Sequence, residues 1–484
     1  MQDRRTFLRT TVGAAAALAA CETAAPPKPN ILFILVDDLG WADIGVNGSS
    51  LYETPNIDRL AAEGMRFTNG YAACPVCSPT RASIQTGKYP ARLQLTNFIS
   101  GPHQWPYSEV IPPLFEQALP LAETTIAEAL SGAGYRCGSI GKWHLGGEGF
   151  SPREQGYDYN YAGTQSGMPQ SFFYPQWEGN PPVVGADGEY LPDHLTDRAL
   201  EFIEQDPQQP FFLYLPFYAV HIPIEAKPEH IARFAAKTRE GLVPGVDQHN
   251  PIYAGMIWSV DENVGRLLDK LDQLGIAENT VVFFMSDNGG LQSPEWKDEP
   301  VTSNLPLRAG KGHVYEGGIR EPWIVRWPGV TAAGSVSDIP VISVDFFPTI
   351  LEMAGVEQAA GANPVDGRSI VPILQGRGGD PQRPLFWHYP HYSNQLGRPG
   401  GAVRVGDWKL IEFYDDNSLE LYNLVQDIGE QHNLLAEQPD RAQQMLQMLR
   451  DWRESVQAAM PTPNPDYDPA KRMVRERPGL SRAK

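Results

Sequence analysis

The sequence predicts an α/β fold. A large, mostly parallel sheet carries helices on both faces, and a small C-terminal subdomain adds an antiparallel sheet and a helix. The first observation is a set of short predicted strands at 31–36, 136–140, 211–216 and 280–286, of which all but 136–140 are apolar runs rich in β-branched or aromatic residues. Such runs are typical of strands buried on both faces. The second observation is that helical patterns lie between the runs, which favours helices packed on both faces of the sheet.

Helix signals separate the predicted strands in chain order. Thr54 is a suitable N-cap and Pro55 suits the first helical position, so a helix is predicted to begin there. The amphipathic segment 253–274 is the longest predicted helix, and it leads into the strand at 280–286. Two further helices are predicted over residues 124–130 and 344–353.

The C-terminal part of the chain has a different pattern. Composition changes near the Gly- and Pro-containing segment 376–381, which we take as a boundary. Strand-like runs separated by short turns follow, at 385–389, 402–413 and 419–424, and a helix is predicted over 440–458. The predicted organisation is an export signal with a lipobox at 1–21, a tether at 22–29, a main domain at 30–380, a C-terminal subdomain at 381–460 and a tail at 461–484. The Pro-rich, charged tail is either disordered or strapped across the surface.

Acidic residues outnumber basic ones, with 58 Asp and Glu against 39 Lys and Arg and a net charge of −19. This excess argues against nucleic acid as a partner. The content of 42% hydrophobic and 20% charged residues is that of an ordinary soluble protein. If the substrate is an anion, the chain must therefore gather positive charge locally.

The first residues predict a targeting segment rather than part of the fold. Arg4 and Arg5 resemble a twin-arginine export signal, and the apolar stretch 12–20 is too short to span a membrane. Cys21 ends this stretch in what resembles a bacterial lipobox, which predicts lipidation; the alternative is simple cleavage within the alanine run. We expect an exported bacterial protein that is periplasmic or anchored to a membrane by a lipid on Cys21.

Two predicted strands end in oxygen-bearing side chains. Asp37 and Asp38 follow the first strand, and Asp287 and Asn288 follow the last. Because sites in open α/β sheets form outside the carboxyl ends of strands, these ends can converge. Adjacent carboxylates repel unless a cation lies between them, and hard oxygen ligands suit Ca²⁺ or Mg²⁺. The alternative is a solvated strand end.

Further segments carry lysine or histidine after predicted strands. Lys142 and His144 follow the second strand between glycines, where a surface loop is the alternative. A lysine there would be a point charge for an anion, and a histidine would be a base near neutral pH. His221 follows the third strand, and its alternative is a structural loop histidine. Lys311 lies in the segment 310–322, whose glycines let backbone approach closely.

The pentapeptide at 77–81, Cys-Ser-Pro-Thr-Arg, resembles the signature of type I sulfatases. Similar motifs of that family stand in order at 141–146, 221–223 and 310–322, so the resemblance covers about residues 30–355. It implies the alkaline-phosphatase-like fold and one Ca²⁺ per chain. It also implies that Cys77 is converted to formylglycine, and hence that a formylglycine-generating or sulfatase-maturating enzyme is a partner.

The resemblance implies a role for each site residue. Ca²⁺ is expected on the side chains of Asp37, Asp38, Asp287, Asn288 and the modified Cys77. The positive field around the sulfate is expected from Arg81, Lys142 and Lys311. One hydroxyl of the formylglycine hydrate would attack sulfur while Asp287 takes its proton. His221, with Lys311, would protonate the leaving alcohol, and His144 would deprotonate the second hydroxyl so that sulfate leaves.

Some residues near these motifs have structural or open roles. Cys74 has the spacing of a redox motif with Cys77, but the resemblance outweighs that interpretation. Cys137 lies in a predicted buried strand, and the sequence leaves a Cys74–Cys137 disulfide open. Glu316 and Arg320 are assigned to a supporting ion pair.

Loop residues are candidates for choosing the substrate. His103, Trp105, His388, His391 and Arg404 could stack on or hydrogen-bond a sugar, and the alternative is that such residues pack the subdomain interface. The predicted function is a sulfatase acting on sulfated carbohydrate, on a galactose- or galactosamine-type residue. The alternatives are a phosphoester or phosphonate monoester hydrolase of the same superfamily and a non-catalytic, glycan-binding surface lipoprotein.

Overall fold

The computed structural model describes residues 28–101, 108–177, 182–238, 241–294, 297, 299–357 and 364–471. The predicted export signal, Cys21, His103 and Trp105 lie outside the described residues, as do most of the tether and the end of the tail. Among the described residues, no helix is both long and apolar enough to cross a bilayer.

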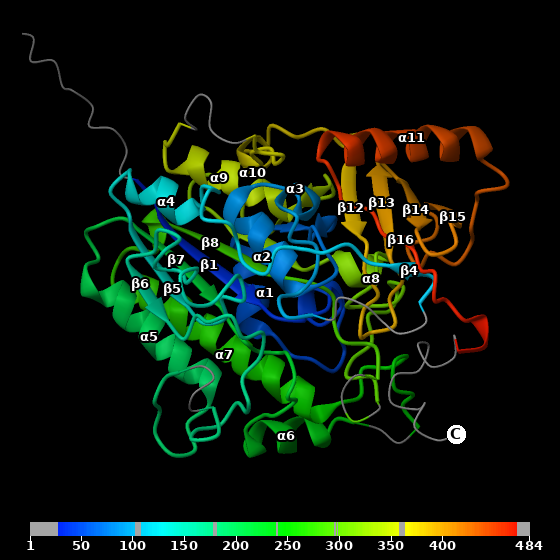
Figure 1. Cartoon of the computed structure of the whole chain (residues 1–484). Coiled ribbons are helices and arrows are strands. Elements are labelled where there is room, and N and C mark those ends of the chain that lie inside the picture. The colour runs from blue at the N-terminus through cyan, green and yellow to red at the C-terminus, as the bar shows by residue number, and fades with distance from the viewer. Residues whose placement is uncertain are drawn as a thin grey trace, which may run out of the picture.

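The main sheet of the described chain has eight strands in the order β10-β2-β9-β8-β1-β7-β5-β6. Figure 1 labels β8, β1, β7, β5 and β6 of this sheet. The strands are β1 (Asn30–Val36), β2 (Met65–Phe67), β5 (Arg136–Ile140), β6 (Tyr159–Tyr161), β7 (Phe211–Pro216), β8 (Thr280–Ser286), β9 (Trp323–Arg326) and β10 (Ser335–Ser337). Both pairs that involve β9 are antiparallel and the other pairs are parallel. The prediction of a large, mostly parallel sheet is confirmed.

Side chains of β1 alternate between two hydrophobic cores, one on each face of the sheet. Leu32 and Ile34 belong to one core, and Ile31 and Phe33 belong to the other. The first core is covered by α1 (Pro55–Glu63), α5 (Leu191–Gln205), α6 (Pro228–Ala235) and α7 (Pro251–Gln273). The second is covered by α2 (Cys77–Thr86), α3 (Pro90–Leu93), α4 (Ile126–Ser131), α9 (Phe346–Met353) and α10 (Val371–Leu374). Burial on both faces explains why these strands are continuous apolar runs.

The C-terminal subdomain is an antiparallel sheet covered by one helix, as predicted (Figure 1). Its elements are β12 (Leu385–Tyr389), β13 (Gly400–Val405), β14 (Trp408–Phe413), β15 (Leu419–Asn423) and α11 (Pro439–Ser455). The single run predicted over 402–413 is two strands, because Gly406 has a φ of +57° and begins a turn.

Short elements tie distant segments together. β16 (Thr462–Pro463) pairs with β4 (Val110–Ile111), so the start of the predicted tail lies strapped against the chain. β11 (Val341–Ile342) pairs with β3 (Gly70–Tyr71), and the single-turn helix α8 (Glu316–Ile319) lies between the main sheet and the C-terminal subdomain. Cys74 and Cys137 are both buried free thiols, so they do not form the disulfide that the sequence left open.

Candidate active site

The carboxyl ends of β1 and β8 bring two acidic turns together. These strands are parallel neighbours in register to their last residues, so Asp37 and Asp287 begin side by side. The Asp38 backbone N–H donates to Asp287 Oδ1 over 3.3 Å. Asn288 Nδ2 donates to Asp38 Oδ1 over 2.7 Å, which joins side chains 250 positions apart. The expected convergence of the two strand ends is present in the fold.

Each carboxylate of this cluster faces a buried cation. The distances are 2.8 Å from Arg81 Nε to Asp287 Oδ2, 2.6 Å from Lys142 Nζ to Asp37 Oδ2 and 2.8 Å from Lys311 Nζ to Asp38 Oδ2. Burial raises the pKa of Asp37. Burial also acts to raise the pKa of Asp38, but the charges of Lys311 and His221 outweigh it and lower the pKa to about 2. The cluster thus pairs three carboxyl groups with three basic groups.

Two buried oxygens in the cluster accept no hydrogen bond from the described residues. They are Asp37 Oδ1 and Asn288 Oδ1. A buried oxygen without a donor is costly unless a ligand satisfies it. Ligand atoms of Asp37, Asp38 and His221 lie within 4.8 Å of one another, but His221 Nε2 already faces Lys311 at 2.8 Å. The oxygen-rich donor set fits a hard divalent cation.

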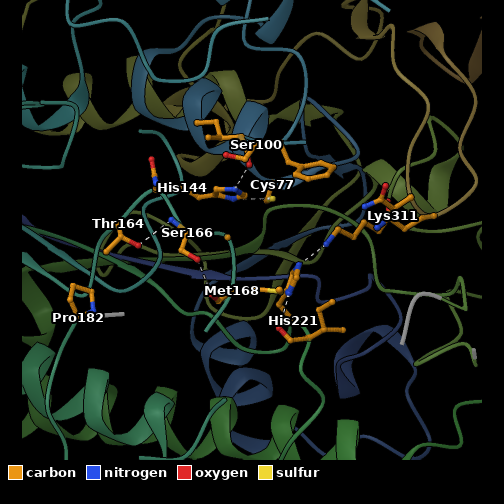
Figure 2. A pocket seen from close by; sticks show the side chains of 16 residues that line it. Cys77, Ser100, His144, Thr164, Ser166, Met168, Pro182, His221 and Lys311 are labelled. Carbon is orange, nitrogen blue, oxygen red and sulfur yellow. Dashed lines mark hydrogen bonds between the residues drawn. The ribbon is translucent and has the colours of Figure 1, made fainter. Parts of the chain in front are cut away.

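Cys77 lies at the start of α2 and faces a histidine. Arg81 follows one helical turn later on the same face, which explains the spacing of the two residues. Cys77 Sγ is 3.3 Å from His144 Nδ1 (Figure 2). His144 Nε2 faces the Ile99 carbonyl at 3.2 Å, so Nε2 carries the ring proton and Nδ1 is the acceptor. Burial and the charge of Lys142 lower the pKa of His144, which makes it a neutral base at neutral pH.

Two of these residues have strained backbones. Asp38 and His144 have φ values of +60° and +56°, which residues other than glycine rarely adopt. The His144 backbone N–H donates to the Thr164 carbonyl over 2.8 Å, one of the contacts that hold this conformation. Such strain persists where the surroundings impose it, and it clusters at functional sites.

His221 and Lys311 form another pair in the same site. His221 Nδ1 faces the Ile222 carbonyl at 3.0 Å, so Nδ1 carries the ring proton and Nε2 accepts from Lys311 Nζ over 2.8 Å. Burial and the charge of Lys311 lower the pKa of His221 to about 3. The Lys311 backbone N–H donates to the Gly290 carbonyl over 3.2 Å, which ties this lysine to the turn after Asn288. The Lys311 ammonium therefore holds the proton of the pair.

A cavity of about 640 Å³ opens onto these groups, and its walls include Cys77, His144, His221 and Lys311 (Figure 2). Its other described lining residues are uncharged; they come from segments 98–100, 164–168 and 394–395, with Pro182 and Ile222. Ser166 N–H donates to Thr164 Oγ1 over 3.1 Å and Ser166 Oγ to the Met168 carbonyl over 3.0 Å, which shapes one wall.

The uncharged walls of the cavity were not predicted from the sequence. Segments 98–100, 164–168 and 394–395 carry no charged motif that would single them out. One signal was available for the second of them. Segment 164–168 follows β6, and loops at the carboxyl ends of parallel strands line the sites of open sheets.

The structure places three of the predicted substrate residues away from this cavity. Both ring nitrogens of His388 are bonded, to Tyr414 Oη at 2.8 Å and to the Ala459 carbonyl at 3.0 Å. His391 and Arg404 are likewise buried and bonded to protein groups. This arrangement fits the alternative role, packing between the main domain and the C-terminal subdomain. Glu316 and Arg320 form the predicted ion pair at 2.8 Å.

Known proteins resemble this chain over most of its length. A family model described as Sulfatase matches residues 29–356, and one described as N-sulphoglucosamine sulphohydrolase, C-terminal, matches residues 309–458. A protein named Sulfatase from Formosa agariphila is 34% identical and covers 88% of each chain. Human N-acetylgalactosamine-6-sulfatase is 35% identical, covering 75% of this chain and 69% of its own length. The structure of Ps i-CgsB in complex with k-i-k-neocarrahexaose has a TM-score of 0.75 at 28% identity, over 94% of this chain and 99% of that one.

Proposed function

This chain belongs to the sulfatase family, and from that premise we propose how its residues cleave a sulfate ester. The chain is a sulfuric ester hydrolase that acts on sulfated carbohydrate. One observation carries the proposed mechanism. Cys77 faces the acceptor nitrogen of a neutral His144 inside a cavity that His221 and Lys311 also line.

A divalent cation, Ca²⁺ in this proposal, would bind Asp37, Asp38, Asp287, Asn288 and the group at position 77. The two buried oxygens without donors, Asp37 Oδ1 and Asn288 Oδ1, support this assignment. Bound there, Ca²⁺ would supply positive charge for the sulfate oxygens. Arg81 and Lys142 orient their carboxylate partners for that ligand.

The proposed nucleophile is a formylglycine made from Cys77. Burial raises the pKa of the Cys77 thiol, which argues against a cysteine thiolate as the attacking group. A formylglycine would supply a hydrated aldehyde, of which one hydroxyl attacks sulfur and the other re-forms the aldehyde. Asp287 takes the proton of the attacking hydroxyl. His144 Nδ1, 3.3 Å from the side-chain atom of residue 77, takes the second proton so that sulfate leaves.

The leaving alcohol is assigned to the side of the cavity that holds His221 and Lys311. Lys311 Nζ donates to His221 Nε2 over 2.8 Å, so one proton of the Lys311 ammonium lies between these two nitrogens. Delivered to the ester oxygen, that proton would neutralise the alkoxide as the bond to sulfur breaks. Lys311 also faces Asp38, which links the acid of the reaction to the cation site.

For the substrate, we propose a galactose-configured sugar residue that carries one sulfate. A human relative is named N-acetylgalactosamine-6-sulfatase, and Ps i-CgsB was solved in complex with k-i-k-neocarrahexaose. The described cavity wall supports a neutral sugar. It offers hydrogen-bonding side chains such as Gln165, Ser166 and Asn394, and no cation beyond the reacting groups for a second anion.

Maturation and location are further parts of this proposal. A formylglycine-generating or sulfatase-maturating enzyme acts on Cys77 before folding, because the side chain is buried in the fold. The twin-arginine pattern and the lipobox around Cys21 support export and lipid anchoring in a bacterial envelope.

The mass of the peptide that carries Cys77, from protein made in its own host, tests the nucleophile. A loss of about 18 Da, thiol to aldehyde, is expected. Turnover of p-nitrophenyl sulfate should exceed turnover of p-nitrophenyl phosphate, and Cys77→Ala is the matched blank for both. An unmodified thiol in a protein that turns over sulfate esters would contradict the proposed nucleophile. Faster phosphate turnover would favour the phosphoester alternative.

A further inference from the structure

The short helix α8 contacts or continues three segments that carry residues of the candidate active site. The Gly289 N–H, next to Asn288, donates to the Gly318 carbonyl over 3.1 Å. The fit is close, since a Cβ on Gly289 would lie 1.9 Å from the Gly317 carbonyl oxygen. The Ala72 N–H, in the segment leading to Cys77, donates to the Ile319 carbonyl over 2.8 Å. Lys311 lies in the loop that runs directly into α8.

The C-terminal subdomain holds α8 through buried charges. Glu316, the first residue of α8, accepts from Lys409 Nζ of β14 over 2.9 Å. The Glu316 backbone N–H donates to Glu430 Oε2 over 2.7 Å, and Lys409 Nζ lies 2.9 Å from Glu430 Oε1. The side chains of Glu316, Lys409 and Glu430 are fully buried. A helix of one turn is not stable alone, so these contacts determine where α8 lies.

We propose that Lys409 and Glu430 are positioning residues for the active site, acting through α8 on the turn that carries Asn288 and on the loop that carries Lys311. The inference rests on the proposed function for its activity readouts. The subdomain would then set the geometry of a cation ligand and of the acid in the reaction. Residues that orient such groups from outside usually change metal affinity or activity by about 10-fold to 100-fold when replaced.

A second buried ion pair on β14 provides a matched control. Arg453 Nη1 of α11 lies 2.7 Å from Glu412 Oε2, and both side chains are about nine-tenths buried. Glu412 and Lys409 belong to the same strand, but the ion-pair partners of Glu412 among the described residues are Arg450 and Arg453 of α11, not α8. Arg453→Met therefore removes a buried cation from the subdomain without touching the proposed path to the site.

The test compares Lys409→Met with Arg453→Met in three measurements, at a temperature where both are folded by circular dichroism. Hydrogen exchange of the peptide containing Gly289 should be faster in Lys409→Met only, because its amide partner on α8 is loosened. Calorimetry should give a Ca²⁺ Kd weaker by at least about tenfold, and kcat for p-nitrophenyl sulfate should fall by a similar factor. Arg453→Met should stay within about twofold of the wild-type protein in all three measurements.

Equal responses of the two variants, or a Lys409→Met variant that loses only thermal stability, would overturn the inference. If Lys409→Met does not fold, Glu430→Gln carries the same comparison at pH 8, above the pKa of Glu430, where it keeps the shape of the side chain and removes its charge. Hydrogen exchange does not depend on sulfatase activity. A wild-type protein without turnover would therefore count against the proposed function, while the exchange result would still decide the role of Lys409.

Discussion

Two clusters of buried charge, on either side of α8, differ in how completely their polar atoms are paired. Around α8, each carboxylate oxygen of Glu316 and Glu430 lies within 2.9 Å of a donor nitrogen or hydroxyl, although Glu430 Oε1 meets Lys409 as an ion pair and not as a hydrogen bond. At the strand ends, Asn288 Oδ1 accepts no hydrogen bond from the described residues, and Asp37 Oδ1 has only the more distant Arg81 Nη2, at 3.8 Å.

Buried charge by itself therefore does not identify a site in this fold. Both clusters combine acids and bases within hydrogen-bonding distance, and in both the pKa values of carboxyl groups are shifted. Among the described residues, the strand-end cluster is the one that reaches the cavity of about 640 Å³, through Lys311, and it has the oxygens that lie farthest from any donor. On the proposals above, the paired cluster would stabilise and position, and the incompletely paired one would bind and react.

The largest expected effect is at Cys77, which lines the cavity beside the strand-end cluster. Cys77→Ala should abolish turnover of p-nitrophenyl sulfate. Cys77→Ser should stall after one slow sulfate transfer, because a serine has no second hydroxyl on the same carbon with which to expel the sulfate. Rapid-quench measurement of alcohol released per enzyme checks this. Repeated turnover by the serine variant would refute the scheme.

Lys311→Met tests the acid of the reaction. It should lower kcat/KM for p-nitrophenyl sulfate by about 10³-fold, since it removes both the proton donor to His221 and a cation near the sulfate. Circular dichroism should show a folded protein. Lys227→Met, which removes a lysine paired with Asp193 on the surface, is the control and should leave kcat/KM unchanged. A loss no larger than that of the control would remove Lys311 from the mechanism.

In contrast to Lys311→Met, whose main effect is on kcat/KM, Lys409→Met should cause a large loss of stability. Removing one partner from a buried ion-paired group leaves Glu316 and Glu430 without their shared cation. The expected loss is about 3 kcal/mol of unfolding free energy, measured by urea denaturation. A change below about 0.5 kcal/mol would mean that the paired cluster contributes little to stability.

Removal of the divalent cation should destabilise only the incompletely paired cluster. Chelation followed by addition of Ca²⁺ at a hundredfold excess over its Kd should restore about 2.7 kcal/mol of unfolding free energy. At the same Ca²⁺ concentration, set by the Kd of the wild-type protein, Asn288→Ala should have a smaller gain, because Asn288 Oδ1 is one of the buried oxygens without a donor. An identical gain in Asn288→Ala would exclude that residue as a ligand.

The last expected effect, similar in size to that of the cation, concerns pH. Burial raises the pKa of Glu430 to about 7, with Glu316 adding to the shift and Lys409 opposing it. The folded protein therefore keeps a proton that the unfolded chain releases near pH 4.5. This stabilisation is complete below that pH and is lost as pH rises to about 7, a fall of roughly 2–3 kcal/mol. Glu430→Gln should have a correspondingly flatter curve of unfolding free energy against pH; an unchanged slope would contradict the assignment.

Much of the fold and of the charged site could be predicted because the signals are local. The apolar runs of β1 and β8 end in acidic residues at known positions, and parallel strands bring such ends to one edge of a sheet. The turn at Gly406 was missed because the apolar pattern continues on both sides of it. Similarly, the antiparallel direction of β9 depends on where the chain re-enters the sheet, which its own residues do not encode.

The pairing of side chains across distant segments could not be predicted. His388 is polar and lies among aromatic residues, a pattern that suits sugar binding and interior packing equally well, and only the position of Tyr414 decides between them. Lys409 carries no motif, and its role depends on meeting Glu316 from another subdomain. Segment 164–168 is likewise recognised as a cavity wall only because it faces the same cavity as Cys77 and His144.

The burial of Cys77 has a consequence for the order of events during synthesis of the chain. With the side chain only 3% exposed, an enzyme that modifies it must reach it on the nascent polypeptide. The ribosome makes Lys409 and Glu430, which hold α8 in place, long after it has made Cys77. On the proposed role of α8, the strand ends lack this support until those residues emerge. The late position of the support in the chain would thus leave a period of translation in which the proposed formylglycine can be made from Cys77 before the fold closes over it.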